Sequence, residues 1–202
     1  MSLMSKEARM KKLGEEVSKC QLCGLCEGRQ NPVLGEGSLD ATVIFIGEAP
    51  GRKEDEMGRP FVGSAGLVLD RLLDHIGLGR EHVYIDNVVK CRPPNNRRPR
   101  SKEVEACSLH LERQLEIIEP GIVAPMGNSA IRHLMKRFGL VPSPIGKIHG
   151  KLCELEAPWG RAILFPMYHP AAAIYRRQLE RVLEEDFESL KRIMDCVDLP
   201  RI

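Results

Sequence analysis

The sequence lacks any long hydrophobic run. No stretch approaches the roughly 20 apolar residues that a membrane-spanning helix needs. With 43% hydrophobic and 29% charged residues, the composition is that of a soluble globular protein. The first ten residues, MSLMSKEARM, contain no apolar segment of the kind that directs secretion. We therefore expect a cytoplasmic protein that does not contact membranes, and the second methionine, Met4, suggests that the leading Met-Ser-Leu is an expression scar.

Net charge is also small, and the chain is short for two full domains. A formal net charge of +2 excludes a long basic surface as the main basis of nucleic-acid binding, but leaves room for a local basic patch. Domains mostly run to roughly 100–200 residues, so a chain of 202 residues fits one domain. We expect a single domain over residues 1–202, with residues 1–15 as an N-terminal segment.

Four short apolar runs alternate with helical patterns. The runs cover residues 41–46, 83–89, 121–126 and 162–168. Apolar residues recur at helical spacing over residues 69–76, ahead of Gly77, and over residues 104–118, where Ser101 is a candidate cap. A third helical pattern covers residues 176–195. This alternation predicts an α/β fold, with a parallel sheet covered by helices on both faces.

Polar residues follow each of the four predicted strands. Glu48 comes after the first, Asn87 near the end of the second, Asn128 after the third and His169 after the fourth. In open α/β sheets, ligands bind beyond the carboxyl ends of the strands. Any such protein has some polar residues there, but the expected convergence of an acid, two amides and a histidine on one edge favours a functional site.

The cysteines indicate a metal site. In a reducing cytosol, seven cysteines indicate metal ligands or small buried side chains more than disulfides. Cys20, Cys23 and Cys26 have CxxCxxC spacing, and Cys91 and Cys107 lie much further along the chain. Two thiolates on one tight turn, completed by a second pair, can bind zinc or an iron–sulfur cluster. The spacing does not separate these two, and it leaves five candidates for four positions.

Four motifs in a fixed order make the sequence recognisable: GEAPG, GRPFVGSAG, NVVKCRPPNNR and HPAAAI, with the CxxC ahead of them. Together they resemble the family four, iron–sulfur uracil-DNA glycosylases over roughly residues 20–190. The resemblance implies a three-layer α/β/α sandwich with a central four-stranded parallel sheet and a [4Fe-4S] cluster. It further implies an enzyme that flips uracil out of DNA and hydrolyses its N-glycosidic bond, leaving an abasic site for base excision repair.

The same resemblance assigns the binding residues. The cluster ligands are expected at Cys20, Cys23, Cys91 and Cys107, and Cys26 matches a position that is not a ligand. Asn87 is expected to read uracil, because a side-chain amide pairs with both O4 and the N3 proton, whereas cytosine presents the reversed pair. Phe61 is expected to stack on the flipped base. The expected substrate-binding set is Gly47, Ala49, Pro50, Gly51, Glu54, Phe61 and Asn87.

Glu54 is the weakest member of this set. In the family a residue near this place lies against C5 of uracil and helps to exclude the methyl group of thymine. A solvated acid in a charged loop is an equal alternative for it.

Two residues are expected to carry the chemistry. Breaking the glycosidic bond leaves a sugar with cationic character and a base that departs as an anion. Glu48 is expected to stabilise the sugar cation and orient the attacking water, and His169 to donate a hydrogen bond to uracil O2. The rigid turn from Gly47 to Gly51 would hold Glu48 in place and offer backbone N–H groups to the base.

DNA is expected to bind through a helix N-terminus and a basic loop. The segment GSAG, residues 63–66, opens a helix whose N–H groups suit a phosphate, and the loop of residues 90–100 concentrates Lys90 and four arginines. Which residue after His169 fills the gap left by the flipped base stays open. The expected DNA contacts are Ser64, Ala65, Gly66, Arg92, Arg97 and Arg177.

Two alternatives compete with this hypothesis. One is a related glycosylase that stays covalently attached to the abasic site through a histidine in an inserted loop, but the sequence has no such insertion. The other is a non-catalytic iron–sulfur module that binds DNA or senses damage. Glu48, Asn87 and His169 together argue against it, because binding alone does not need all three. We expect a monomer whose partner is uracil-containing DNA, single- or double-stranded.

Overall fold

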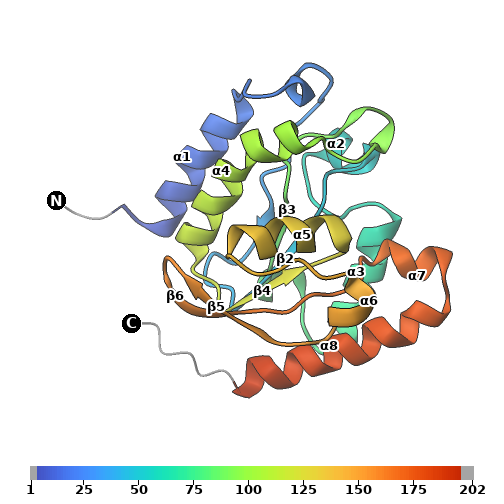
Figure 1. The fold of residues 1–202 in the computed structure, drawn as a ribbon. Coiled ribbons are helices and arrows are strands. Elements are labelled where there is room, and N and C mark those ends of the chain that lie inside the picture. The colour runs from blue at the N-terminus through green and yellow to red at the C-terminus, as the bar shows by residue number, and fades with distance from the viewer. Residues whose placement is uncertain (1–3, 197–202) are drawn as a thin grey trace.

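The computed structural model describes residues 4–196, so the proposed expression scar lies outside the described residues. A six-stranded sheet runs through the molecule in the order β1-β3-β2-β4-β6-β5 (Figure 1). The strands are β1 (Glu36–Gly37), β2 (Val43–Gly47), β3 (Tyr84–Asn87), β4 (Ile122–Pro125), β5 (Cys153–Ala157) and β6 (Gly160–Leu164).

The sheet is mixed. Strands β3, β2, β4 and β6 run parallel to one another, and β1 and β5 add to the two edges in antiparallel orientation. The expectation of a four-stranded, wholly parallel sheet is therefore corrected, because it missed both edge strands. Strand β1 has only two residues, and β5 reads Cys-Glu-Leu-Glu-Ala with one buried position. Neither presents the continuous apolar run that marks a buried strand.

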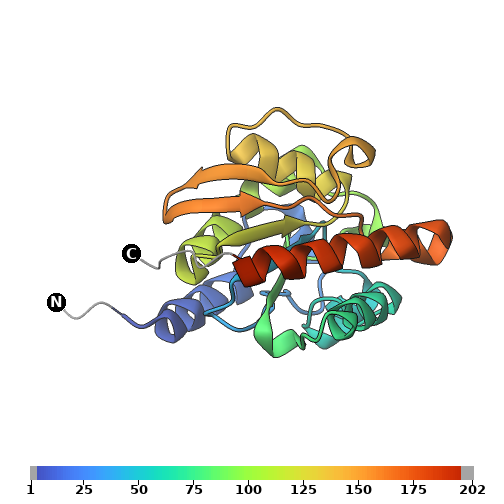
Figure 2. The ribbon, with the colours of Figure 1, turned by 90° about the horizontal axis from the view of Figure 1, so that it is seen from below.

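Helices cover both faces of the sheet, as the alternating pattern predicted (Figures 1 and 2). One face packs against α1 (Lys6–Ser18), α4 (Ser101–Ile118) and α5 (Asn128–Arg137). The other packs against α3 (Ser64–His75) and α8 (Gln178–Cys196). No helix in the described range 4–196 has the length and apolar character to cross a membrane. The short helices are α2 (Arg52–Met57), α6 (Ile145–Ile148), α7 (Ala171–Tyr175), η1 (Gly24–Glu27), η2 (Arg80–His82) and η3 (Pro94–Asn96).

Strand β2 shows why the central strands are apolar throughout. Ile44 and Ile46 belong to the core cluster on one face, and Val43 and Phe45 to the cluster on the other. Successive side chains of a strand point to opposite faces, so a strand between two helical layers must be apolar at every position. On the α8 side, the rings of Phe45 and Phe187 stack with centroids 5.5 Å apart.

The helix ends follow local chemistry, with one correction. Helix α3 ends at His75, ahead of Gly77, whose φ of +70° suits glycine, as predicted. Helix α4 begins at Ser101, but Ser101 is not its cap. Arg100 occupies the capping position, and its N–H donates to the Glu103 carboxylate at 2.6 Å. The Glu103 carboxylate thus accepts the N–H of the capping residue, which is the other half of a capping box from the one a serine hydroxyl would supply.

Candidate active site

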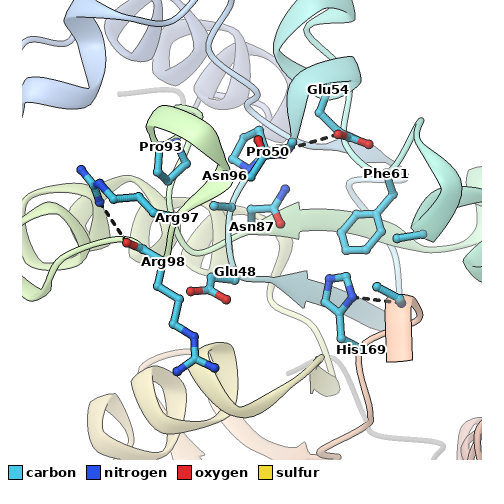
Figure 3. Close-up of a pocket in the computed structure, with 14 residues that line it drawn as sticks. Glu48, Pro50, Glu54, Phe61, Asn87, Pro93, Asn96, Arg97, Arg98 and His169 are labelled. Atoms are coloured by element: carbon cyan, nitrogen blue, oxygen red, sulfur yellow. Dashed lines mark hydrogen bonds between the residues drawn. The ribbon is translucent and has the colours of Figure 1, made fainter. Parts of the chain in front are cut away.

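A pocket of about 370 Å³ lies at the carboxyl ends of the parallel strands (Figure 3). Ten residues expected at the site from the sequence line it: Glu48, Ala49, Pro50, Gly51, Glu54, Phe61, Ala65, Asn87, Arg97 and His169. Four further lining residues were not among the assigned site residues: Pro93, Asn96, Arg98 and Ala171. Pro93, Asn96 and Arg98 belong to the basic loop after the second predicted strand, which we had interpreted only as a phosphate-binding surface.

Three strands deliver the polar side chains to this pocket. Glu48 follows β2, Asn87 ends the neighbouring β3, and His169 comes shortly after β6. The backbone carbonyl of Glu48 accepts the N–H of Val89 at 3.2 Å, which ties the turn after β2 to the segment after β3. Asn128 was wrongly expected here: its Oδ1 accepts the N–H of Ile145 at 3.0 Å and supports α6 instead.

Glu48 has a buried oxygen without a partner. Its Oε1 is buried and forms no hydrogen bond within the described residues. Burying a carboxylate oxygen without a hydrogen bond is costly, and such exceptions in folded proteins call for a functional explanation. Figure 3 shows the carboxylate in the pocket below Asn87. Glu48 thus lines the pocket with a carboxylate whose hydrogen-bonding capacity is not used up by the described residues.

His169 presents a defined tautomer. Its Nδ1 accepts the backbone N–H of Ala171 at 3.2 Å, so the neutral ring carries its proton on Nε2. Burial lowers the pKa of His169 to about 4, which keeps the ring neutral near pH 7. Gly127, whose φ is +86°, lies close to the start of this side chain, because a Cβ there would be 3.2 Å from the His169 Cβ. His169 is thus a neutral hydrogen-bond donor in the pocket wall.

Asn87 and Phe61 meet over Gly47. Asn87 is 2% exposed and Phe61 is 5% exposed. A Cβ on Gly47 would overlap the Asn87 Oδ1 and lie 2.7 Å from the Phe61 Cζ. The Phe61 ring also stacks on the His169 ring, with centroids 5.5 Å apart and planes inclined by 27°. Glycine at position 47 is therefore required for the amide and the two rings to share one pocket.

Phe61 is held in an uncommon backbone conformation. Its φ of +51° lies in the left-handed region that a bulky residue rarely adopts. The Arg80 guanidinium donates to the carbonyls of Pro60 and Phe61, and it also pairs with Glu36 and Asp70 at 2.6 Å each. No local pattern in the sequence indicates Arg80, which lies outside every motif. Its role depends on contacts between distant segments.

Glu54 connects two loops. Its carboxylate accepts backbone N–H groups from Gly51 at 3.1 Å, Val62 at 2.9 Å and Gly63 at 2.7 Å. These bonds join the turn after β2 to the loop that carries Phe61. Glu54 is therefore neither a solvated acid nor a side chain free to move; it lines the pocket while fixing the two loops that form its wall.

The basic loop is more internally paired than expected. Arg97 pairs with Glu103 at 2.6 Å, and Arg92 donates to the Asn96 Oδ1 at 2.7 Å. Lys90 was wrongly placed on the DNA-binding surface, because its side chain is only 1% exposed and lies inside the protein. Arg98 is exposed and lines the pocket, with its side chain extending past Glu48 (Figure 3).

The remaining expected DNA contacts lie at two places. Ser64 is exposed at the start of α3, and Arg177 is exposed between α7 and α8. Gly66 is buried, and a Cβ there would overlap the carbonyl oxygen of Phe61. The structure therefore gives Gly66 a packing role, as the point where α3 passes close to the Phe61 loop.

Five cysteines line a second, small cavity. It is bounded by Cys20, Cys23, Cys26, Cys91 and Cys107. We call it the thiol cavity. Within residues 4–196, no three His, Cys, Asp or Glu side chains converge closely enough to hold a single metal ion. Burial raises the pKa of the Cys23, Cys91 and Cys107 thiols, that of Cys107 to about 11.

Hydrogen-bond partners contact three of these sulfurs. Arg29 donates to the Cys91 Sγ at 3.2 Å, and the backbone N–H of Lys90 donates to the Cys107 Sγ at 3.3 Å. The His110 Nε2 lies 3.3 Å from the Cys20 Sγ.

Comparison with known proteins identifies similar sequences. Residues 34–191 match the family model of the uracil DNA glycosylase superfamily. A Type-4 uracil-DNA glycosylase of Saccharolobus solfataricus is 47% identical over 90% of this chain and 85% of its own length. The Archaeoglobus fulgidus protein of that name is 46% identical over 87% of this chain and 88% of its own. The Thermotoga maritima one is 42% identical over 94% of this chain and 96% of its own.

Proposed function

The chain belongs to the uracil DNA glycosylase superfamily, among its Type-4 members, and from this premise we propose that it excises uracil from DNA through the pocket described above. It is a DNA glycosylase, a hydrolase of the N-glycosidic bond that acts in DNA repair. A base inside a duplex is out of reach, so the nucleotide must flip out, at a cost of a few kcal/mol, into a fitted pocket.

Asn87 reads the base in this proposal. Its amide can donate to uracil O4 and accept from N3–H, and its burial means that a base with the reversed pattern leaves both groups unpaired. Phe61 supplies a stacking face, worth roughly 1–3 kcal/mol per base. Glu54 supports both residues by fixing the Phe61 loop against the turn after β2.

Glu48 and His169 carry the chemistry. The Glu48 carboxylate, which lines the pocket, orients the attacking water and accepts its proton, and its charge stabilises the cationic sugar. The Nε2–H of His169 donates to uracil O2 as negative charge develops on the departing base. The observation that carries the proposal is the unpartnered Glu48 oxygen in the same pocket as a neutral histidine and a buried amide.

We place the DNA backbone along the exposed residues at the pocket mouth. Arg98 is exposed, whereas the guanidinium of Arg97 is paired with Glu103. This difference favours Arg98 as a phosphate contact. The N-terminus of α3 at Ser64 and Ala65, together with Arg177, supplies further contacts. Arg92 and Arg97 shape the loop through their own hydrogen bonds. None of these contacts reads sequence, since phosphates carry no base information.

The thiol cavity fits a [4Fe-4S] cluster held by Cys20, Cys23, Cys91 and Cys107. Three of the four cysteines assigned by the family resemblance, Cys20, Cys91 and Cys107, have hydrogen-bond partners at their sulfurs, and hydrogen bonds to sulfur are a feature of iron–sulfur sites. A bound cluster would supply cross-links between the segment before η1, the loop after β3 and helix α4. Binding requires thiolates, so it would release protons from these buried thiols.

We also propose that the described chain is one domain that acts as a monomer. Met10, Leu13 and Val17 of α1 belong to the same core cluster as Ile44 and Ile46 of the sheet. The N-terminal segment is therefore part of the fold. A single core on each face of one sheet supports one folding unit.

The direct test is base release from a uracil-containing oligonucleotide, single- and double-stranded, with thymine and cytosine oligonucleotides as controls. Glu48→Gln is the matched variant, because it keeps the shape of the side chain and removes its charge. We expect the parent protein to release uracil alone, and Glu48→Gln to be strongly impaired while binding the same DNA. If the iron-loaded parent protein binds the oligonucleotide but releases no base, the non-catalytic DNA-binding alternative replaces this proposal.

A further inference from the structure

A buried ion pair lies directly behind the pocket. The Lys90 Nζ is 2.6 Å from the Asp86 Oδ2, and the two side chains are 1% and 0% exposed. Removing two charges from water is costly, and replacing a buried ion pair by apolar residues of similar size is often neutral or stabilising. Stability alone is therefore a weak reason for this pair. Its other contacts indicate what it does.

Both partners bind the backbone of Asn87. The Asp86 Oδ1 accepts the Asn87 N–H at 2.7 Å, and the Lys90 Nζ donates to the Asn87 carbonyl at 2.9 Å. The ion pair thus holds the two polar backbone groups of the residue that presents the amide to the pocket. Hydrogen bonds to charged groups are about twice as strong as neutral ones, so this arrangement restrains the peptide on both sides.

Lys90 also connects this arrangement to the thiol cavity. Its backbone N–H donates to the Cys107 Sγ at 3.3 Å, and its chain neighbour Cys91 lines the same cavity. The side chain of Lys90 therefore holds the Asn87 carbonyl while its backbone is fixed against α4. Asn87 is therefore held by two buried side chains that do not themselves line the pocket.

We propose that the Asp86–Lys90 pair is a positioning device for Asn87, which sets the amide in the orientation that uracil requires. This inference rests on the proposed function. Neither residue touches the base, so both act only through Asn87. A misplacement of about 1 Å can cost about 10²-fold in rate, which sets the size of the expected effect.

The test is a double-mutant cycle with Asn87. Lys90→Met keeps the length of the side chain and removes its charge. Asp86→Asn/Lys90→Met removes both charges, so no buried charge is left unpaired. Each is combined with Asn87→Ala, which deletes the amide but keeps the backbone groups that the pair holds. The measurement is the single-turnover rate of uracil release at saturating enzyme, normalised to the folded fraction from circular dichroism.

We expect each substitution in the pair to lower the rate of uracil release by about 10²-fold in the parent background and by less than about twofold in the Asn87→Ala background. Free uracil should also inhibit the pair variants less strongly than the parent protein. A purely structural role predicts equal losses in the two backgrounds, and that result would overturn the proposal. If Lys90→Met does not fold, the doubly neutral variant and the isosteric Asp86→Asn carry the same test.

Asp186→Asn is the matched control. Asp186 is a buried carboxylate, 3.1 Å from the His149 Nδ1, and it contacts neither residue of the pair. Its effect should be the same in both backgrounds.

The outcomes also separate the two proposals. Absence of uracil release by the parent protein overturns the proposed function, whereas release with equal losses overturns only the positioning role. Full activity of Asn87→Ala overturns the reading role of Asn87 and the positioning role with it.

Discussion

His169 is set up to act as a neutral donor. Since burial lowers its pKa to about 4, its charge does not change between pH 5 and pH 8. We expect His169→Ala to slow base release by about 10²–10³, the usual loss for a donor aimed at developing charge. The ratio of parent to variant rates should stay constant over that pH range. A step in the ratio near pH 6.5 would contradict the assigned protonation state, and single-turnover rates across the range provide the measurement.

A substitution at Gly47 tests how tightly Asn87 and Phe61, the residues proposed to bind the base, are packed. In Gly47→Ala the new methyl group would overlap the Asn87 Oδ1 and crowd the Phe61 ring, so one of them must move. We expect about 10²-fold slower uracil release with little change in DNA binding. Gly28→Ala is the control, because a Cβ there meets no atom within 4 Å. An active Gly47→Ala protein would show that the amide and the ring do not share the base as proposed.

At the scale of elements, Arg80 holds the Phe61 loop against η2 and α3. Removing its guanidinium in Arg80→Met frees the carbonyls of Pro60 and Phe61, and the strained backbone of Phe61 can relax. We expect a roughly tenfold lower kcat/KM from lost stacking. Arg59→Met is a close control, since Arg59 also pairs with Glu36, at 2.7 Å, but is largely exposed. Similar losses in the two variants would contradict a specific role for Arg80.

The start of α4 depends on Glu103. Its carboxylate accepts the Arg97 guanidinium and the Arg100 N–H, so Glu103→Ala should lower the free energy of unfolding by about 0.5–2 kcal/mol. Glu105→Ala, on the exposed side of the same turn, should be nearly neutral. Chemical denaturation of both variants checks this. A loss as large in Glu105→Ala would show that charge or helix propensity is responsible.

The Arg97–Glu103 ion pair makes the stabilisation of the start of α4 depend on pH. The hydrogen bond from Arg97 lowers the pKa of Glu103 in the folded protein below its usual value of 4.5. Between the two values the unfolded chain binds more protons, so stability falls as the pH falls. The difference in the free energy of unfolding between the parent protein and Glu103→Ala should therefore be complete above about pH 4.5. It should shrink as the pH falls through the pKa of Glu103 in the folded protein.

The elements that the sequence predicted are those with a clear hydrophobic pattern, either a strand buried on both faces or a helix with one buried stripe. Strands β2, β3 and β4 have no exposed position, and α3, α4 and α8 present apolar stripes at helical spacing. Strand β5 and the two residues of β1 pair at the sheet edges through backbone hydrogen bonds. Such pairing does not require apolar side chains, so neither strand contains an apolar run. Edge strands are therefore the part of this fold that a hydrophobic pattern cannot predict.

At the scale of the whole molecule, the thiol cavity joins three distant segments. Cys23→Ala should lose most of the bound iron and lower the melting temperature, because the cluster would no longer tie these segments together. Cys26→Ala should keep the iron content of the parent protein, since the family resemblance assigns no ligand to position 26. Iron content, visible absorbance and thermal melting provide the measurements. Equal iron loss in both variants would show that Cys26 is a ligand.

The sequence predicted the pocket better than the network behind it. Glu48, Asn87 and His169 follow strands, so topology brings them together, and the family resemblance assigns their roles. Arg80 acts through contacts with segments that are distant in the sequence. Asp86, Asn87 and Lys90 are near neighbours in the chain, and it is the burial of their charges that the sequence does not indicate. A lysine in a basic loop is usually solvated, and only the structure places Lys90 inside the protein.

The order of residues along the chain has a consequence for synthesis. Every cysteine of the thiol cavity lies at or before Cys107, whereas the pocket is incomplete until β6 and His169 have been made. Chains emerge from the ribosome N-terminus first. The nascent protein therefore exposes all of its cavity thiols before it contains the histidine that is proposed to assist base release. Under the proposed function, assembly of the cluster would precede completion of the active site, and a newly finished enzyme would not wait for its iron.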